Sequence, residues 1–202
     1  MEPFITLSAV AAPYDRNNVD TDQIIPARFL LKRRTDPVYP TYLFHDLRFN
    51  AEGAETPEFV LNQPAYRGAK IFVANANFGG GSSREAAAIA LQTYGVRCVI
   101  AVTFGDIFYN NCIKNGVLPI PLSHEAAALL RRQLHASPGA TLTVDLPAQS
   151  VTDPEGNIHA FDIDAFSKTC LVEGLSQIRL TLRHADEIDA FERRYRETVT
   201  WV

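Results

Sequence analysis

Short apolar runs alternate with helical patterns through the middle of the chain. The continuously apolar residues 69–74, 98–103 and 117–120 are typical of buried parallel strands. Between them, residues 82–94 and 106–114 have helical patterns that end at Gly95 and at Asn115-Gly116. This β-α-β-α-β order predicts a parallel sheet with right-handed crossovers.

The flanking regions add patterns of both kinds. Strands are predicted over residues 4–10, 141–146 and 158–161, and the turn formers of residues 153–157 separate the last two. Helices are predicted over residues 42–49, 124–135, 164–173 and 184–196. We therefore expect an α/β protein with a central parallel sheet, flanking helices and a smaller antiparallel sheet.

Composition narrows the class of protein. The 202 residues are 47% hydrophobic and carry a formal net charge of −4, as in an ordinary soluble domain. The lack of a basic stripe argues against nucleic acid as a partner. No apolar run approaches the roughly 20 residues of a membrane helix. The start of the chain lacks the charged region of a signal peptide, so we expect a cytoplasmic protein.

The cysteines do not form a ligand pattern. Cys98, Cys112 and Cys170 are widely spaced, and no CxxC pair occurs. We therefore expect buried, reduced thiols, with no metal or iron–sulfur cluster bound by this chain.

The strongest chemical signal lies where the first apolar run of the parallel core ends. The sequence there reads Gly79-Gly80-Gly81-Ser82-Ser83-Arg84-Glu85 and leads into a helical pattern. A glycine-rich turn before a helix presents backbone N–H groups to an anion, and the helix dipole favours negative charge there. Two hydroxyls and a guanidinium at this place exceed what a turn requires.

Three interpretations of this loop compete. A nucleotide loop is disfavoured because no lysine follows the glycines and Arg84 stands where a dinucleotide fingerprint has its third glycine. A structural role is favoured by the S-x-x-E spacing of Ser82 and Glu85, which is typical of a capping box. A carboxylate site is favoured by Arg84, which can bind a carboxylate through two hydrogen bonds.

The same residues resemble a known family. The run from Asn77 to Glu85, NFGGGSSRE, resembles the serine loop of the swivelling domain of aconitase-type hydro-lyases. NVDTDQIIP at residues 18–26, LFHDLRF at 43–49, FYNN at 108–111 and residues 163–181 resemble the small subunit of 3-isopropylmalate dehydratase. The resemblance spans nearly the whole chain. It implies a swivelling β/β/α domain over residues 1–202, with a C-terminal helical extension.

The resemblance also implies a reaction and roles. The holoenzyme interconverts 2-isopropylmalate and 3-isopropylmalate in leucine biosynthesis, and a 4Fe-4S cluster in a separate large subunit acts on the departing hydroxyl. Such an enzyme is a heterodimer or heterotetramer, and its small subunit is inactive when alone. Ser82 is implied as the base; Ser83, Arg84, Thr21 and Asp22 are implied as binding the small dicarboxylate substrate. The basic loop of residues 28–34 is implied to close over it, with Arg33 or Arg34 holding the second carboxylate.

The loop also departs from the family pattern. Gly80 stands where relatives usually have cysteine, Ala86 replaces histidine, Ala88 replaces proline and Ile89 replaces tryptophan. The serines and the arginine are retained, so the chemistry is a firmer expectation than the substrate. Two alternatives stay open. One is the small subunit of a hydratase for another substituted malate, of the dimethylmaleate or citramalate type. The other is a non-catalytic regulatory partner subunit.

Overall fold

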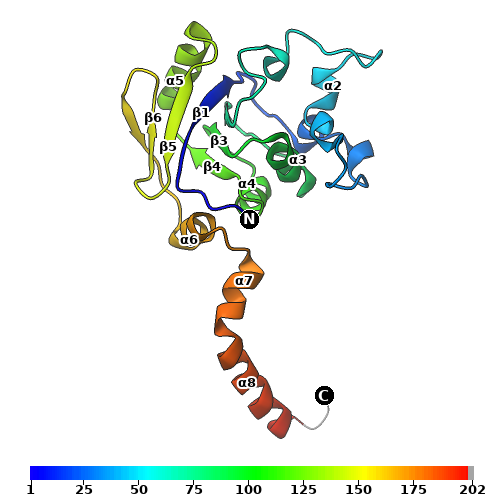
Figure 1. The fold of residues 1–202 in the computed structure, drawn as a ribbon, viewed down its shortest axis with the longest axis vertical. Helices are drawn as coiled ribbons and strands as arrows, with labels where there is room; N and C mark the ends of the chain where they lie inside the picture. The colour runs from blue at the N-terminus through cyan, green and yellow to red at the C-terminus, as the bar shows by residue number, and fades with distance from the viewer. Residues whose placement is uncertain (200–202) are drawn as a thin grey trace.

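A seven-stranded mixed sheet organises the protein. The computed structural model describes residues 1–199, and the strand order is β4-β3-β2-β1-β5-β6-β7 (Figure 1). The strands are β1 (Thr6–Pro13), β2 (Ile71–Val73), β3 (Cys98–Ala101), β4 (Leu118–Pro121), β5 (Thr141–Asp145), β6 (Ser150–Thr152) and β7 (Ile158–Ala160).

Strand β1 joins the two parts of the sheet. Its C-terminal half pairs with β2 in parallel, and its N-terminal half pairs with β5 in antiparallel fashion. Strands β2, β3 and β4 are parallel, whereas β5, β6 and β7 form an antiparallel meander. The predicted parallel core and antiparallel strands are both confirmed, and they form one continuous sheet.

Helices cover both faces of the parallel part. Within residues 1–199 the helices are α1 (Thr21–Ile24), α2 (His45–Arg48), α3 (Ala86–Tyr94), α4 (Asp106–Lys114), α5 (His124–Ala136), α6 (Ala165–Glu173), α7 (Gln177–Thr181) and α8 (Ala185–Thr198). The last two lie away from the sheet (Figure 1). The short 3-10 turns are η1 (Ala27–Phe29), η2 (Tyr39–Tyr42), η3 (Val60–Asn62) and η4 (Leu182–His184).

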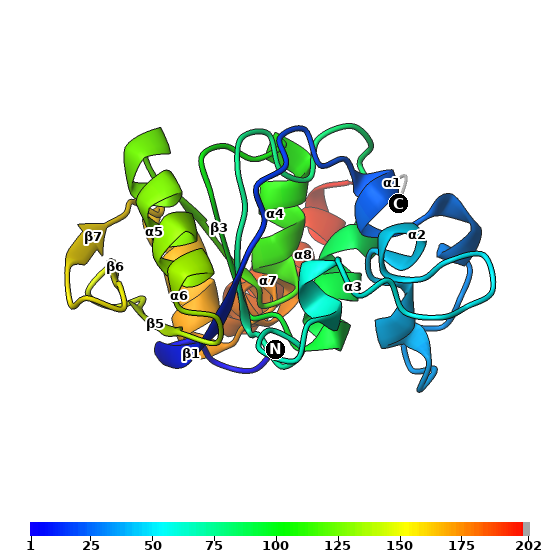
Figure 2. The ribbon, with the colours of Figure 1, turned by 90° about the horizontal axis from the view of Figure 1, so that it is seen from above.

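The sheet separates two hydrophobic cores, and successive side chains of β2 belong to different cores. Phe72 packs in the cluster that includes Leu91 of α3, while Ile71 packs in the cluster of Leu130 of α5 and Leu171 of α6. Successive strand side chains point to opposite faces, which explains the division. Seen from above, α3 lies on one side of the strands, and α5 and α6 lie on the other (Figure 2).

Three sequence predictions need correction. The predicted helix over residues 42–49 is shorter than expected. Phe44 has φ +50°, which is not helical, so α2 begins only at His45. Strand β6 was not predicted, since its three residues are identified as a strand only by pairing with β5 and β7. The turn of residues 153–157 therefore joins β6 to β7. Helix α7 was also missed, although Ser176 caps it by accepting a hydrogen bond from the Arg179 backbone N–H at 3.2 Å.

The last helices leave the body of the molecule. Helices α7 and α8, joined by η4, extend from α6 as a C-terminal arm (orange to red in Figure 1). Within residues 1–199, no residue of α7, η4 or α8 is buried. None of the helices in the described part of the chain is long and apolar enough to cross a membrane.

Candidate active site

The glycine–serine–arginine segment, which we call the serine loop (residues 77–85), is anchored to the strand neighbouring its own. The Phe78 backbone N–H donates to the Thr103 carbonyl at 2.9 Å, and the Gly105 N–H donates to the Phe78 carbonyl at 3.0 Å. These bonds continue the parallel pairing of β2 and β3 beyond the strand ends. The loop thus lies at the carboxyl edge of the sheet, where ligands bind in open α/β folds.

A second segment, distant in sequence, is bonded to the loop backbone. The Gly79 N–H donates to the Val19 carbonyl at 2.7 Å, and the Thr21 N–H donates to the Gly80 carbonyl at 3.1 Å. Asp20 caps α1 by accepting from the Gln23 N–H at 2.7 Å, which fixes where that helix starts. The structure therefore brings the residues that precede and begin α1 to the serine loop.

An ion pair joins the two segments through their side chains. The Arg84 guanidinium contacts the Asp22 carboxylate, and both side chains retain solvent access, at 24% and 55% exposure. Thr21, the first residue of α1, is buried. Arg84 is thus already oriented by a carboxylate, the chemical group that the sequence led us to expect it to bind.

The two serines are available to a ligand. Ser82 and Ser83 are exposed, and among residues 1–199 their hydroxyls form no hydrogen bond. The loop beneath them is held from α4, where the Asn111 side-chain amide reaches the Ser83 carbonyl at 3.5 Å and that of Asn115 donates to Glu85 Oε1 at 2.9 Å. The backbone is held while the hydroxyls stay free.

The predicted capping box of Ser82 and Glu85 is wrong. Helix α3 begins at Ala86, and the residue at its N-cap is Glu85, which has helical dihedrals and makes no side-chain cap bond. The Glu85 carboxylate binds the Asn115 amide instead. A tertiary contact with α4 has replaced the local hydrogen bond, so capping does not account for Ser82.

Two of the three glycines are required by packing and backbone conformation. Gly79 has φ +72°, and a Cβ there would approach Cγ of the Phe108 ring to 2.1 Å. Gly81 has φ +91°, where a side chain is strained. At Gly80, where relatives usually have cysteine, a Cβ would come within 2.9 Å of Oδ1 of Asn77. The Asn77 amide donates to Asn18 Oδ1 at 2.9 Å, which adds another tie to the N-terminal segment.

The basic loop lies apart from this cluster. Arg33 and Arg34 are exposed between η1 and η2, and in the described part of the chain neither bonds to the serine loop. Arg28 instead pairs with Asp46, and that guanidinium lowers the pKa of the Asp46 carboxyl to about 2. The role implied for Arg33 and Arg34 stays a prediction.

Sequence reasoning missed the residues that support the loop. Phe108 fills the space above Gly79, and Asn111 and Asn115 hold the loop from one face of α4. The available signal was a pair of amides four residues apart, one on the predicted helix of residues 106–114 and the other at the Asn115-Gly116 stop, a spacing that places them on one face.

The thiols do not form a metal site. Cys98, Cys112 and Cys170 are free and buried, and burial raises the pKa of each thiol, which disfavours the thiolate that a metal needs. Among residues 1–199, no group of three or more histidine, cysteine, aspartate or glutamate side chains could hold a metal ion.

Comparison with known proteins finds relatives over the whole length of the chain. The model of the aconitase C-terminal domain matches residues 1–125, LeuD_N matches 128–165, and the C-terminal domain of the 3-isopropylmalate dehydratase small subunit matches 178–202. Proteins named 3-isopropylmalate dehydratase small subunit from Roseobacter denitrificans and Azorhizobium caulinodans are 48% and 49% identical, over the full length of both chains. This chain belongs to the 3-isopropylmalate dehydratase small-subunit family.

A solved structure supports the fold of this small-subunit family member. The 3-isopropylmalate dehydratase from Methanocaldococcus jannaschii superposes with a TM-score of 0.65 at 22% identity, covering 93% of this chain and 99% of that one. The predicted fold class and family are therefore confirmed.

Proposed function

We propose that this chain is the small subunit of a hydro-lyase of leucine biosynthesis. With a large subunit, it interconverts 2-isopropylmalate and 3-isopropylmalate by losing and regaining water through 2-isopropylmaleate. The observation that carries the proposal is the backbone pairing of residues 18–22 with the serine loop, in a member of this family. That pairing gathers Thr21, Asp22, Ser82, Ser83 and Arg84 at one edge of the sheet.

Arg84 binds one carboxylate of the substrate. Its guanidinium is already paired with the Asp22 carboxylate. Asp22 is more exposed than Arg84, so a substrate carboxylate from solvent can replace Asp22 as the partner of Arg84. The Ser83 hydroxyl and the buried Thr21 add polar groups at this place. Asp22 then has the role of holding Arg84 in position before substrate enters.

Ser82 moves the proton next to that carboxylate. A serine hydroxyl is a weak acid, and its alkoxide needs nearby positive charge to form. Arg84 lies two residues away, and the following helix presents its positive end to the loop. The exposure of Ser82 in this chain implies that another surface must exclude water from it during turnover.

The large subunit is assigned the cluster chemistry. A 4Fe-4S cluster there supplies a Lewis acid for the departing hydroxyl. The buried thiols of this chain do not fit a ligand role, so its contribution is the base and the carboxylate clamp. A heterodimer or heterotetramer in the cytoplasm is the corresponding assembly.

A second substrate has one specific observation in its favour. Gly80 and Ala86 flank the retained groups, and both are smaller than the cysteine and histidine usual in relatives. A related enzyme for dimethylmalate or citramalate keeps the serine loop and changes around it.

The proposal is tested by reconstitution. The chain is assayed under anaerobic conditions with and without its cognate large subunit, on 2-isopropylmalate, citramalate and dimethylmalate. We expect turnover only in the mixture, and fastest with 2-isopropylmalate. Substantial hydratase activity from the isolated chain would overturn the two-subunit proposal, and a faster reaction with another malate would reassign the substrate.

A further inference from the structure

Exposed large apolar side chains are concentrated on the helices from α4 to the C-terminal arm, outside the active site. More than half of those that are exposed in the described chain lie on α4, α6, α7, η4 and α8. We call this set the apolar arm surface; it consists of Ile107, Phe166, Ile178, Leu182, Phe191 and Tyr195. Patches of this kind on soluble proteins mark interaction sites.

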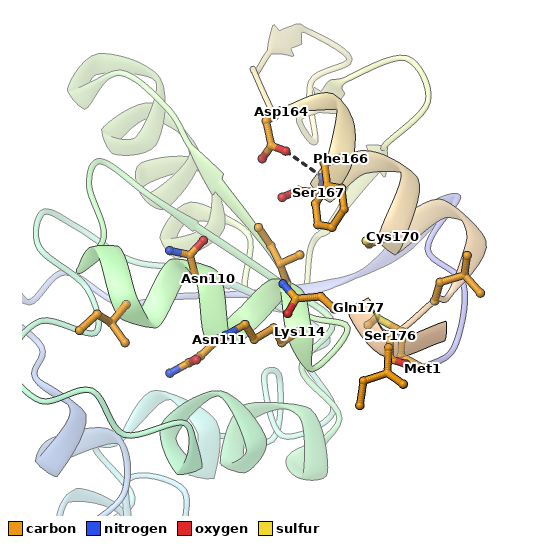
Figure 3. A pocket seen from close by; sticks show the side chains of 14 residues that line it. Met1, Asn110, Asn111, Lys114, Asp164, Phe166, Ser167, Cys170, Ser176 and Gln177 are labelled. Atoms are coloured by element: carbon orange, nitrogen blue, oxygen red, sulfur yellow. Dashed lines mark hydrogen bonds between the residues drawn. The ribbon is translucent and has the colours of Figure 1, made fainter. Parts of the chain in front are cut away.

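A groove forms the upper part of this surface. It encloses about 690 Å³ between α4, α6 and the start of α7. Figure 3 shows Asn110 and Lys114 on α4, across the groove from Phe166 and Cys170 of α6, while the Asn111 amide points away from α6. Ile107 and Ile178 line it as well, and they are 51% and 72% exposed.

The arm forms the lower part. Ile188, Phe191 and Tyr195 follow one another at helical spacing, and the rings of Phe191 and Tyr195 stack with centroids 5.7 Å apart. Arg193 and Glu197 lie on the opposite face by the same periodicity. Burial of apolar surface is worth roughly 25 cal/mol per Å², yet within residues 1–199 no residue of this helix is buried. An amphipathic helix that leaves its apolar face exposed in the described part of the chain can bind a partner through that face.

Helix α4 connects this surface to the active site. Its Asn111 reaches the Ser83 carbonyl, while its Ile107, Asn110 and Lys114 line the groove. A protein that covers Ser82 would therefore lie next to α4, and the groove is lined by the same helix. The arm also falls in residues 178–202, which match the model of the small-subunit family's own C-terminal domain, beyond the aconitase domain match that ends at residue 125.

We propose that the apolar arm surface is the docking site of the large subunit. In the complex, the apolar face of α8 packs against the large subunit. This inference rests on the proposed function, because the proposed function identifies the large subunit as the partner. The groove and the arm fix the orientation in which the partner covers the serine loop. The chemistry stays with the loop, and the arm contributes affinity.

The test compares two double variants of the full chain. Phe191→Ser with Tyr195→Ser removes the apolar face of α8, and Arg193→Ser with Glu197→Ser removes charged side chains from the opposite face of the same helix. The dissociation constant for the anaerobic large subunit is measured by titration, and circular dichroism checks the helix. We expect the first pair to raise the dissociation constant at least tenfold, with kcat at saturation unchanged, and the second to change it less than twofold.

A variant outside the arm tests the groove separately. Ile107→Glu places a charge at the groove edge and is also expected to weaken binding, with the melting temperature showing that the body still folds. Wild-type affinity in both the arm variant and Ile107→Glu overturns the proposal. Loss of self-association of the isolated chain, with unchanged affinity for the large subunit, overturns it in favour of a second copy. If the wild-type complex forms but turns over none of the malates, the proposed function fails while the docking result stands.

Discussion

The serine loop and the C-terminal arm differ in how the chain holds them. The loop backbone is bonded to residues 19–21, to residues 103–105 and to α4, with Phe108 packed against Gly79. The arm joins the body through α6 and the ion pair of Arg183 with Glu173, and within residues 1–199 no residue of its helices is buried. One region is held by its own chain, and the other has its apolar face exposed.

The difference matches the division of tasks that we propose. Proton transfer and carboxylate binding need groups held in fixed positions. An interface needs apolar side chains that stay available until the partner arrives. Changes in the loop should therefore alter turnover or folding, and changes in the arm should alter assembly.

The largest effect is expected at the proposed base. Ser82→Ala removes the hydroxyl, and loss of general base catalysis lowers rates by about 100-fold to 10,000-fold. We expect kcat of the reconstituted complex to fall by at least about 100-fold. Ser176→Ala, which removes only a cap in the arm, is the matched control and should keep wild-type kcat.

The packing of the loop is tested at Gly79. Gly79→Ala combines a left-handed backbone with a clash against Phe108, and strain and overpacking of this kind cost about 2–4 kcal/mol together. Calorimetry should show a melting temperature lower by roughly 5–15 °C, at 2–4 °C per kcal/mol for a chain of this size. Gly53→Ala serves as control, because a Cβ there meets no neighbour although its φ is also positive. Equal losses in both variants would leave backbone strain alone as the cause.

The carboxylate clamp is tested by Arg84→Lys. Lysine keeps the charge and loses the paired N–H groups, so about 1.5–3 kcal/mol of binding should be lost. Steady-state kinetics should show kcat/KM reduced about tenfold to 100-fold, with the affinity between subunits unchanged. An unchanged kcat/KM would remove Arg84 from the site.

A buried carboxylate outside both regions gives a pH-dependent reference. Burial alone would raise the pKa of Asp153, but hydrogen bonds from Gln133 and Asn157 outweigh it and hold that pKa below its ordinary value. Its stabilisation is present above pH about 4 and is lost as pH falls through the folded-state pKa. Denaturant titrations from pH 5 to pH 3 should therefore show a smaller loss of stability in Asp153→Asn than in wild type. Glu155→Gln, exposed in the same turn, should follow wild type.

The smallest effect is expected on the melting temperature when the arm is removed. A chain that ends at Leu175 loses no buried residue of α7, η4 or α8. Its melting temperature should stay within about 3 °C of wild type, which corresponds to about 1 kcal/mol. A loss above about 10 °C would mean that the arm stabilises the body, contrary to the comparison.

The sequence predicted well what depends on local pattern and burial. Helix α4 has the predicted bounds. Strands β2 and β3 lie inside the apolar runs that predicted them, and β4 is shifted by one residue from its run. Each of these elements has continuous burial or a clear stop residue. Strand β6 and the start of α3 depended on tertiary partners, namely β5, β7 and Asn115, that no local pattern reveals.

The site was only partly predictable for the same reason. Glycines followed by serines and an arginine identified an anion site from local chemistry. The approach of Asp22 to Arg84 was implied by the family resemblance, and the structure shows the bonds between Val19, Thr21 and the glycines that cause it. The supporting Phe108 required the three-dimensional packing of α4 on the loop.

One titration tests the division of tasks most directly. Turnover is measured against increasing concentrations of the large subunit for wild type, Ser82→Ala, and Phe191→Ser with Tyr195→Ser. We predict that Ser82→Ala lowers the plateau and leaves the midpoint of binding unchanged, whereas the arm variant shifts the midpoint and reaches the wild-type plateau. A Ser82→Ala plateau equal to wild type, or an arm variant that lowers the plateau at an unshifted midpoint, would contradict it.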